Sequence, residues 1–264
     1  MNFVTVNGLQ LAYRIDGADV AAPLVLLNAL GTDLRMWDEQ VAALSAGFRV
    51  IRYDMRGHGR SGIPHEPASL EQLGHDLLAL LDHLGIERAH VCGISLGGIV
   101  ALWLAIHHPE RVERAVFANT AARIGSEALW EGRIAAVREG GMRAVRGAVI
   151  ARLFSDHFRA RHPERVCLFG DMLSATDPAG YTAACAALRD GDLRASVGHI
   201  SAPSLILAGA LDQATPPAQS EELHAAIAGS ELVVLAEAAH LSNVEQPEIF
   251  NTYLLQWFGS RQSA

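Results

Sequence analysis

Ala89-His-Val-Cys-Gly-Ile-Ser-Leu-Gly-Gly98 is the stretch of sequence from which the fold can be inferred. Residues 89–92 have the character of the end of a buried strand, and residues 97–106 are apolar almost all round, which is typical of a buried helix. Between them, residues 93–97 fit the pattern G-x-S-x-G, which predicts a sharp turn from strand to helix. Such a turn strains the backbone of Ser95, and its two glycines remove Cβ atoms that would otherwise collide. The Ser95 hydroxyl would then lie where the free N–H groups of a helix can stabilise an anion.

Apolar runs on both sides of this stretch predict further buried strands, separated by helices. Strands that alternate with helices are typical of an α/β fold with a mostly parallel, twisted sheet flanked by helices. Asn7-Gly8, between two alternating segments, adds an N-terminal hairpin with a type I′ turn. The expected strands span residues 3–6, 9–15, 23–27, 48–53, 89–92, 115–118, 204–208 and 231–235, and the expected helices 37–44, 70–84, 97–106, 218–227 and 247–258.

The segment of residues 122–195 differs from the rest of the chain. It is rich in arginine and consists of consecutive helical patterns with no convincing strand. An all-helical insert in an α/β frame is most simply a cap over the strand ends, where loops build a site. We therefore expect a core of residues 1–121 and 196–264, and a helical cap of residues 122–195.

Three residues follow predicted strands in the order that serine hydrolysis requires. A serine hydroxyl needs a base to remove its proton, and the base needs a carboxylate to hold its tautomer. Asp212 and His240 follow the strands at 204–208 and 231–235, so Ser95, Asp212 and His240 form the candidate catalytic triad. Other candidates have less suitable positions: Asp190 and Asp192 in the helical insert, His199 after no strand and His224 within a helix.

A tetrahedral intermediate on Ser95 would need two N–H donors for its oxyanion. Leu96 follows the serine at the start of a helix and supplies one backbone N–H. The loop after residues 23–27 should supply the second, at Leu30. Because the backbone donates, an apolar side chain is no obstacle at either position.

Composition excludes several classes of function. A formal charge of −8 argues against nucleic acid and anionic membranes as partners. No apolar run is long enough to span a bilayer, and the N-terminus lacks the pattern of a signal peptide. Three cysteines without C-x-x-C spacing indicate reduced thiols and a cytoplasmic protein. No cluster has metal-ligand spacing, so neither a metal nor another cofactor is expected. The sequence does not indicate the oligomeric state.

With these residues in view, nearly the whole chain resembles the α/β-hydrolase superfamily. Asp54-Met-Arg-Gly-His-Gly-Arg-Ser61 is similar to that family's D-x-R-G-x-G-x-S loop, and residues 203–212 are similar to its acid-bearing strand. The usual His-Gly of the oxyanion loop is replaced here by Asn28-Ala29. The resemblance implies the α/β-hydrolase fold and a serine hydrolase without a cofactor.

Within that superfamily, the chain resembles the 3-oxoadipate enol-lactonases of the β-ketoadipate pathway. The resemblance rests on residues 28–33, 119–125, 175–181 and 239–243. It implies hydrolysis of a small anionic enol-lactone, with Trp130 as a wall of the site and Arg133 as the clamp for the substrate carboxylate. Plain cap packing for Trp130 and a solvated surface position for Arg133 remain alternatives. So do another small-ester hydrolase, a cofactor-free perhydrolase of the same fold, and a ligand receptor with slow turnover.

Overall fold

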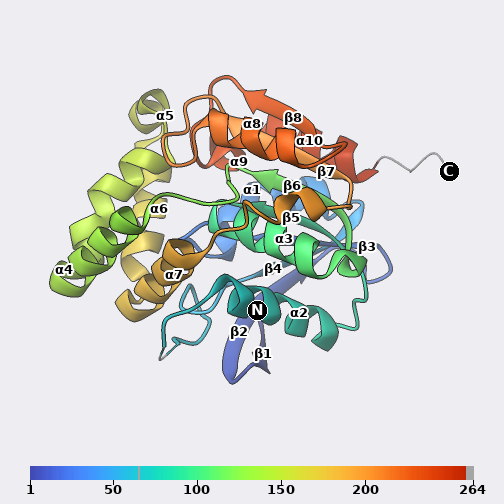
Figure 1. Cartoon of the computed structure of the whole chain (residues 1–264), viewed down its shortest axis with the longest axis horizontal. Coiled ribbons are helices and arrows are strands. Elements are labelled where there is room, and N and C mark those ends of the chain that lie inside the picture. Colours follow the sequence, from blue (N-terminus) through green and yellow to red (C-terminus); the bar gives the residue numbers. More distant parts are fainter. Residues whose placement is uncertain (65, 260–264) are drawn as a thin grey trace.

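The computed structural model describes residues 1–64 and 66–259, which form one eight-stranded sheet with helices on both faces (Figure 1). The strand order is β1-β2-β4-β3-β5-β6-β7-β8. β1 and β2 pair antiparallel, β2 is antiparallel to β4, and all other neighbours are parallel, so the predicted mostly parallel α/β sheet is confirmed. The strands are β1 Asn2–Val6, β2 Leu9–Asp16, β3 Ala22–Leu27, β4 Phe48–Tyr53, β5 Ala89–Ile94, β6 Val112–Ala118, β7 Ser204–Gly209 and β8 Glu231–Leu235.

The predicted N-terminal hairpin is also confirmed. Asn7 and Gly8 join β1 to β2 with φ angles of 48° and 75°, the pair of positive values that defines a type I′ turn. The helix expected from Trp37 begins one residue later, because Leu34–Trp37 first form a 3₁₀ turn, η1, capped by Asp33.

The order of the strands decides which face each helix covers. The step from β3 to β4 runs one way along the sheet, whereas the steps β4 to β5, β5 to β6 and β7 to β8 run the other way. Right-handed crossovers therefore place α1 (Asp38–Leu44) on one face, and α2 (Leu70–His83), α3 (Leu96–His107) and α8 (Pro217–Ala226) on the other. α10 (Pro247–Gly259) packs against α1, and α2 packs against α3. The direction in which successive strands are added to the sheet reverses between β3 and β5. In open α/β sheets the ligand-binding crevice lies beyond the carboxyl ends of the strands at such a reversal.

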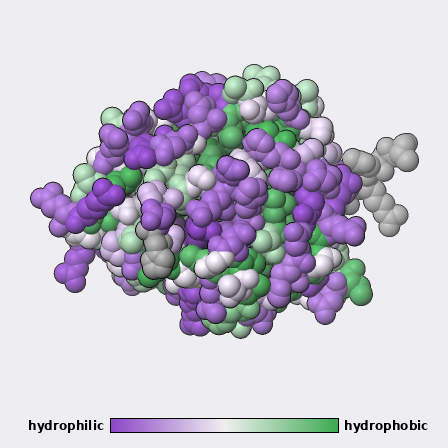
Figure 2. Space-filling view, turned by 60° about the horizontal axis from the view of Figure 1, so that its bottom comes forward, coloured by the Kyte–Doolittle hydropathy of each residue, from purple (hydrophilic) through white to green (hydrophobic). Residues whose placement is uncertain are grey.

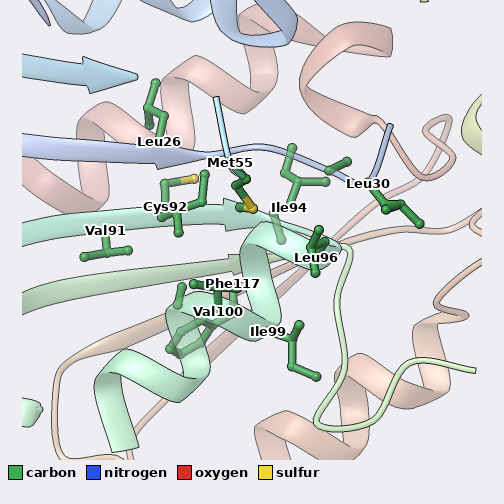
Figure 3. Packing of buried hydrophobic residues seen from close by; sticks show 14 of the residues in the cluster. Leu26, Leu30, Met55, Val91, Cys92, Ile94, Leu96, Ile99, Val100 and Phe117 are labelled. Carbon is green, nitrogen blue, oxygen red and sulfur yellow. The ribbon is translucent and has the colours of Figure 1, made fainter. Parts of the chain in front are cut away.

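The core lies around the central strands and α3. Figure 3 shows Val91 of β5 and Phe117 of β6 on the face of the sheet that α3 covers, with Phe117 near Val100 of α3, whereas Leu26 of β3 points to the opposite face. Cys92 is completely buried in this cluster, and burial raises the pKa of its thiol, so it is an inert core residue, as its position on the strand suggests. A helix buried on nearly every side, as α3 is, explains the apolar run that follows the G-x-S-x-G turn.

Four helices lie between β6 and β7 and stand together at one end of the molecule, on the left in Figure 1. They pack on the core at close backbone contacts: a Cβ on Gly180 of α7 would lie 2.3 Å from the carbonyl oxygen of Gly57. Gly141 (φ 64°) kinks the first of the four.

The limits of this cap, 122 and 195, stay a prediction, and residues 260–264 of the predicted core lie outside the described residues. The four helices are α4 Glu127–Leu153, α5 Asp156–Arg161, α6 Pro163–Ala175 and α7 Pro178–Asp190; the short elements elsewhere are η2 Pro109–Arg111, η3 Val197–His199 and α9 Ser242–Glu245.

The surface in Figure 2 is mostly hydrophilic, with hydrophobic residues in small separate patches. Among the described residues, no helix combines the length and apolar character needed to cross a membrane.

Candidate active site

Ser95 occupies the sharp turn that the sequence predicts between β5 and α3. Its φ angle is 57° and its ψ angle −116°, a conformation that residues with a Cβ rarely adopt. A Cβ on Gly93 would lie 2.2 Å from the carbonyl oxygen of Gly97, and one on Gly97 would lie 2.2 Å from that of Leu27 on β3. The second distance shows that the turn is packed against the backbone of the neighbouring strand β3, so that no side chain fits at position 97. The carbonyl oxygen of Ser95 accepts a hydrogen bond of 2.8 Å from Thr120 Oγ1, which holds the strained residue in place.

Asp212 and His240 come together although 28 residues separate them in sequence. They follow β7 and β8, whose carboxyl ends lie side by side in the sheet. His240 Nδ1 lies 2.8 Å from Asp212 Oδ2, and both side chains are buried. Because a carboxylate can only accept, Nδ1 carries the proton, and Nε2 is left with a free lone pair. This is the tautomer that a general base needs.

The Asp212 carboxylate is held by more donors than His240 alone. Asn119 Nδ2 and Thr215 Oγ1 donate to Oδ2 at 3.0 and 2.8 Å, and the N–H groups of Ala214 and Thr215 donate to Oδ1 at 2.7 and 3.0 Å. Burial alone would raise the pKa of Asp212, but His240 and these hydrogen bonds outweigh it, so the pKa lies below its usual value. The carboxyl group is therefore ionised at neutral pH and can stabilise an imidazolium beside it.

Ser95 and His240 line the same cavity, together with Leu30 and with residues of the cap. Among the described residues, no hydrogen bond joins Ser95 Oγ to the imidazole, and bonds of this kind often tighten only when substrate binds. The cavity has about 510 Å³ of empty space, its open mouth included. The space therefore suits a small substrate.

The loop after β3 presents a backbone N–H near the serine. Within residues 1–64 and 66–259, neither Leu30 N–H nor Leu96 N–H donates to another protein group. Figure 3 shows both leucines beyond the same ends of the strands. The adjacent Gly31 N–H donates to His58 Nε2 at 3.0 Å, and His58 Nδ1 contacts the carbonyl oxygen of Arg56 at 3.1 Å. Burial lowers the pKa of His58, so its ring is neutral, with the proton on Nδ1, and it anchors the loop.

Asn28, which stands where the family usually has histidine, is buried and donates from Nδ2 to the carbonyl oxygen of Tyr53 at 2.9 Å. It thereby fastens the loop after β3 to the end of β4.

The cap supplies the other wall of the cavity. Trp130 is buried and donates from Nε1 to the carbonyl oxygen of Ile124 at 2.6 Å, and Arg133 stacks on its ring at 5.0 Å. Arg152 also lines the cavity and donates from Nη2 to the carbonyl oxygen of Gln213 at 3.0 Å. Neither guanidinium forms an ion pair with an Asp or Glu anywhere in the described part of the chain. The cavity wall thus carries two positive charges, neither of which has a carboxylate at ion-pair distance within the described residues.

Arg152 lines the cavity, but the sequence analysis does not identify it as a site residue. The cap contains many arginines, and only the packing of α4 over the cavity distinguishes Arg152 from the others. Burial and the charge of Arg133 lower the pKa of Arg152, but a guanidinium remains charged at any physiological pH. Asn119, in contrast, directly follows β6 at the same sheet edge as Asp212 and His240, so its position could have indicated it.

The competing candidates lie away from this cavity. Asp190 pairs with Arg189, and Asp192 with Arg194, on the exposed surface. His199 is exposed in η3, and His224 lies within α8, where its Nδ1 is 2.9 Å from Ser230 Oγ. No three His, Cys, Asp or Glu residues among those described are grouped as a metal site requires.

Together, a nucleophile turn, a His–Asp pair and two free N–H groups at one sheet edge define the architecture of an α/β hydrolase. The family described as alpha/beta hydrolase fold matches residues 22–247, and the chain belongs to that family. The predicted fold and family are confirmed.

Within this family, the chain is similar to several named hydrolases. The chain is 42% identical to 3-oxoadipate enol-lactonase 2 of Acinetobacter baylyi over 94% of its own length and 92% of the relative's. It superposes on the crystal structure of the enol-lactonase from Burkholderia xenovorans LB400 with a TM-score of 0.96 and 44% identity, covering 98% of this chain and all of the other. A hydrolase from Pseudomonas aeruginosa PA01 gives a TM-score of 0.95 and 46% identity, over 98% of both chains. These likenesses confirm the predicted enzyme class, a hydrolase of ester bonds.

Proposed function

We propose that this protein is a serine hydrolase that opens 3-oxoadipate enol-lactone to 3-oxoadipate, with Ser95, His240 and Asp212 as its catalytic triad. The observation that carries the proposal is the pair of arginines without acidic partners, Arg133 and Arg152, in the cavity of Ser95 and His240. A small ester that bears a carboxylate matches a cavity with a nucleophile at one wall and uncompensated positive charge at another. The enol-lactonases among the relatives support the same substrate.

The reaction proceeds in two halves. Ser95 Oγ attacks the lactone carbonyl carbon while His240 Nε2 takes its proton, and the N–H groups of Leu30 and Leu96 stabilise the oxyanion. The bond to the ring oxygen then breaks, His240 returns the proton to the leaving enolate, and the enol becomes the ketone. An acyl group remains on Ser95. Water, deprotonated by His240, attacks this acyl group. As the ester bond breaks, His240 returns the proton to Ser95 Oγ, which releases the product and the free serine. No step needs a metal or a cofactor.

The substrate carboxylate would lie between Arg133 and Arg152. Arg133 is held by its stacking on Trp130, and Arg152 by its bond to Gln213, so both are positioned before the substrate arrives. Tyr181 adjoins this wall, and burial raises the pKa of its hydroxyl, which therefore stays protonated and can donate. The small anionic lactone is thus the one partner that we propose, with neither nucleic acid nor a membrane surface as a partner.

A cytoplasmic location is also proposed. Cys92, Cys167 and Cys185 are all free thiols in the structure, and Cys167 is exposed. Unpaired cysteines are typical of a reducing compartment.

The direct test compares the enol-lactone with its own methyl ester, in which the free carboxylate is neutralised. We expect kcat/KM for the anionic lactone to exceed that for the ester by about 10- to 100-fold, because one or two charge-assisted hydrogen bonds are lost. Steady-state rates at low ionic strength measure this ratio. Preference for the methyl ester or for p-nitrophenyl esters would instead indicate another small-ester hydrolase. Faster peracid formation from acetate and hydrogen peroxide would indicate a perhydrolase, and saturable binding without turnover a receptor.

Replacing Arg152 with glutamine should reduce kcat/KM for the anionic lactone by about 10- to 100-fold, through a higher KM, since a charged hydrogen bond contributes about 1.5–3 kcal/mol. The methyl ester should be turned over at nearly the unchanged rate. Arg143→Gln is the matched control, because Arg143 is exposed on the same helix. Equal losses on the charged and the neutral substrate would refute a role for Arg152 in binding the carboxylate.

A further inference from the structure

The loop that carries His240 is linked to the cap on both sides of the histidine, directly on one side and through Glu245 of α9 on the other. On one side, Ala239 N–H donates to Glu245 Oε1 at 3.2 Å. On the other, Leu241 N–H donates to the carbonyl oxygen of Leu153, the last residue of α4, at 3.0 Å. The residue after His240 is therefore attached directly to the cap, and the residue before it is attached to Glu245.

Glu245 links this loop to the corner between α4 and α5. Its Oε1 also accepts from Ser155 N–H at 3.0 Å, and its Oε2 accepts from Ser155 Oγ at 2.5 Å. Ser155 is the N-cap of α5, and its Oγ accepts from Phe158 N–H at 3.3 Å. Within the described residues Glu245 has no cationic partner within ion-pair distance, and these donated hydrogen bonds hold its half-buried carboxylate.

The same corner touches the cavity, because Leu153 lines it together with Ser95 and His240. A ligand in the cavity therefore contacts the segment to which the His240 loop is attached. The Asp212 side of the imidazole is already bonded, whereas its Nε2 has no bond to Ser95. The position of the loop backbone thus decides how far Nε2 lies from the nucleophile.

We propose that Glu245 is a positioning residue: by tying the residue before His240 to Ser155 of the cap, it holds His240 Nε2 in reach of Ser95 Oγ. Because of this link, Ser95 is activated only when the cap is packed on the core and Ser155 is bonded to Glu245. This inference rests on the proposed roles of Ser95 and His240 but not on the identity of the substrate. Misplacement of a catalytic group by about 1 Å can reduce a rate about 100-fold, so a single lost tie is measurable.

The test uses a fluorophosphonate, which reacts once with an activated serine and needs no lactone chemistry. In Glu245→Ala, the rate constant for labelling Ser95 should fall by about 10- to 100-fold. With the lactone, kcat should fall to a similar degree while KM stays within about threefold, because the substrate contacts are intact. Glu248→Ala, an exposed glutamate three residues further on, is the matched control and should react like the wild type.

Glu245→Gln distinguishes position from charge. Its amide oxygen can still accept from Ala239 and Ser155 N–H, and its NH₂ can donate to Ser155 Oγ, so labelling should return to within about threefold of the wild type. Wild-type labelling by Glu245→Ala, even with a lower melting temperature, would reduce Glu245 to a structural residue. A loss in Glu245→Gln as large as that in Glu245→Ala would also overturn the proposal.

The two proposals fail separately. If the wild type is labelled at Ser95 but does not open the enol-lactone, the substrate assignment is wrong and the labelling rates still decide the role of Glu245. If the wild type is not labelled, the assignment of Ser95 and the role of Glu245 are both overturned.

Discussion

Ser95→Ala is expected to lower kcat/KM for the enol-lactone by at least about 10⁴-fold, the largest effect of any single substitution in this chain. Without the hydroxyl no acyl-enzyme forms, and the remaining N–H groups and arginines can only bind the substrate. The protein should stay folded, because alanine also has a Cβ and keeps the same strained φ of 57° that serine has. Steady-state kinetics and a thermal melt of the same sample measure both quantities.

Ser196→Ala serves as the control for Ser95→Ala. Ser196 lies between the cap and β7, and its side chain makes no hydrogen bond within the described part of the chain, so the variant should keep full activity. Binding of the lactone to Ser95→Ala should persist with a similar dissociation constant. Turnover above about 1% of the wild type would mean that another group is the nucleophile.

Asp76→Asn is expected to destabilise the fold by about 3–5 kcal/mol, the cost of leaving a buried charge without its partner. Arg56, in the loop after β4, donates from Nε and Nη2 to Asp76 of α2 at 2.6 and 2.7 Å, and both side chains are at most 5% exposed. Asn7 adds a third bond of 3.0 Å from the hairpin turn. The loop, the helix and the hairpin therefore depend on one carboxylate. Urea unfolding gives the difference in unfolding free energy.

Asp82→Asn, on the same helix, is the matched control for Asp76→Asn. Asp82 pairs with Arg111 at 2.7 Å, but its side chain is 66% exposed, so the loss should be at most about 1 kcal/mol. Replacing Arg56 and Asp76 together with methionine and leucine should recover most of the stability, because no unpaired charge remains. Equal losses in the two single variants would show that burial does not govern this pair.

The candidate triad follows from local patterns in the sequence. The G-x-S-x-G turn indicates its own geometry, since only glycine fits at positions 93 and 97. Asp212 and His240 each follow an apolar strand, and parallel strands bring their carboxyl ends to one edge of the sheet. That rule needs no knowledge of which side chains touch.

The cap residues around the candidate triad could not be predicted in this way. Ser155 donates to Glu245 across 90 positions of sequence, and Arg152 donates to the carbonyl oxygen of Gln213 across 61. Each contact depends on how a loop or a cap helix packs against a distant segment, and no periodicity in the sequence carries that information.

The strand and helix pattern, the strained serine and the order of the candidate triad can all be read from the amino-acid sequence, because they follow from hydrophobic periodicity and from the space that glycine leaves. Only the packing of the folded chain shows that Arg152 lines the cavity beside Arg133, and that the Glu245 carboxylate accepts from the backbone of the His240 loop. Such contacts depend on side-chain packing between elements far apart in the chain, where one arginine or glutamate looks like any other until the fold buries it.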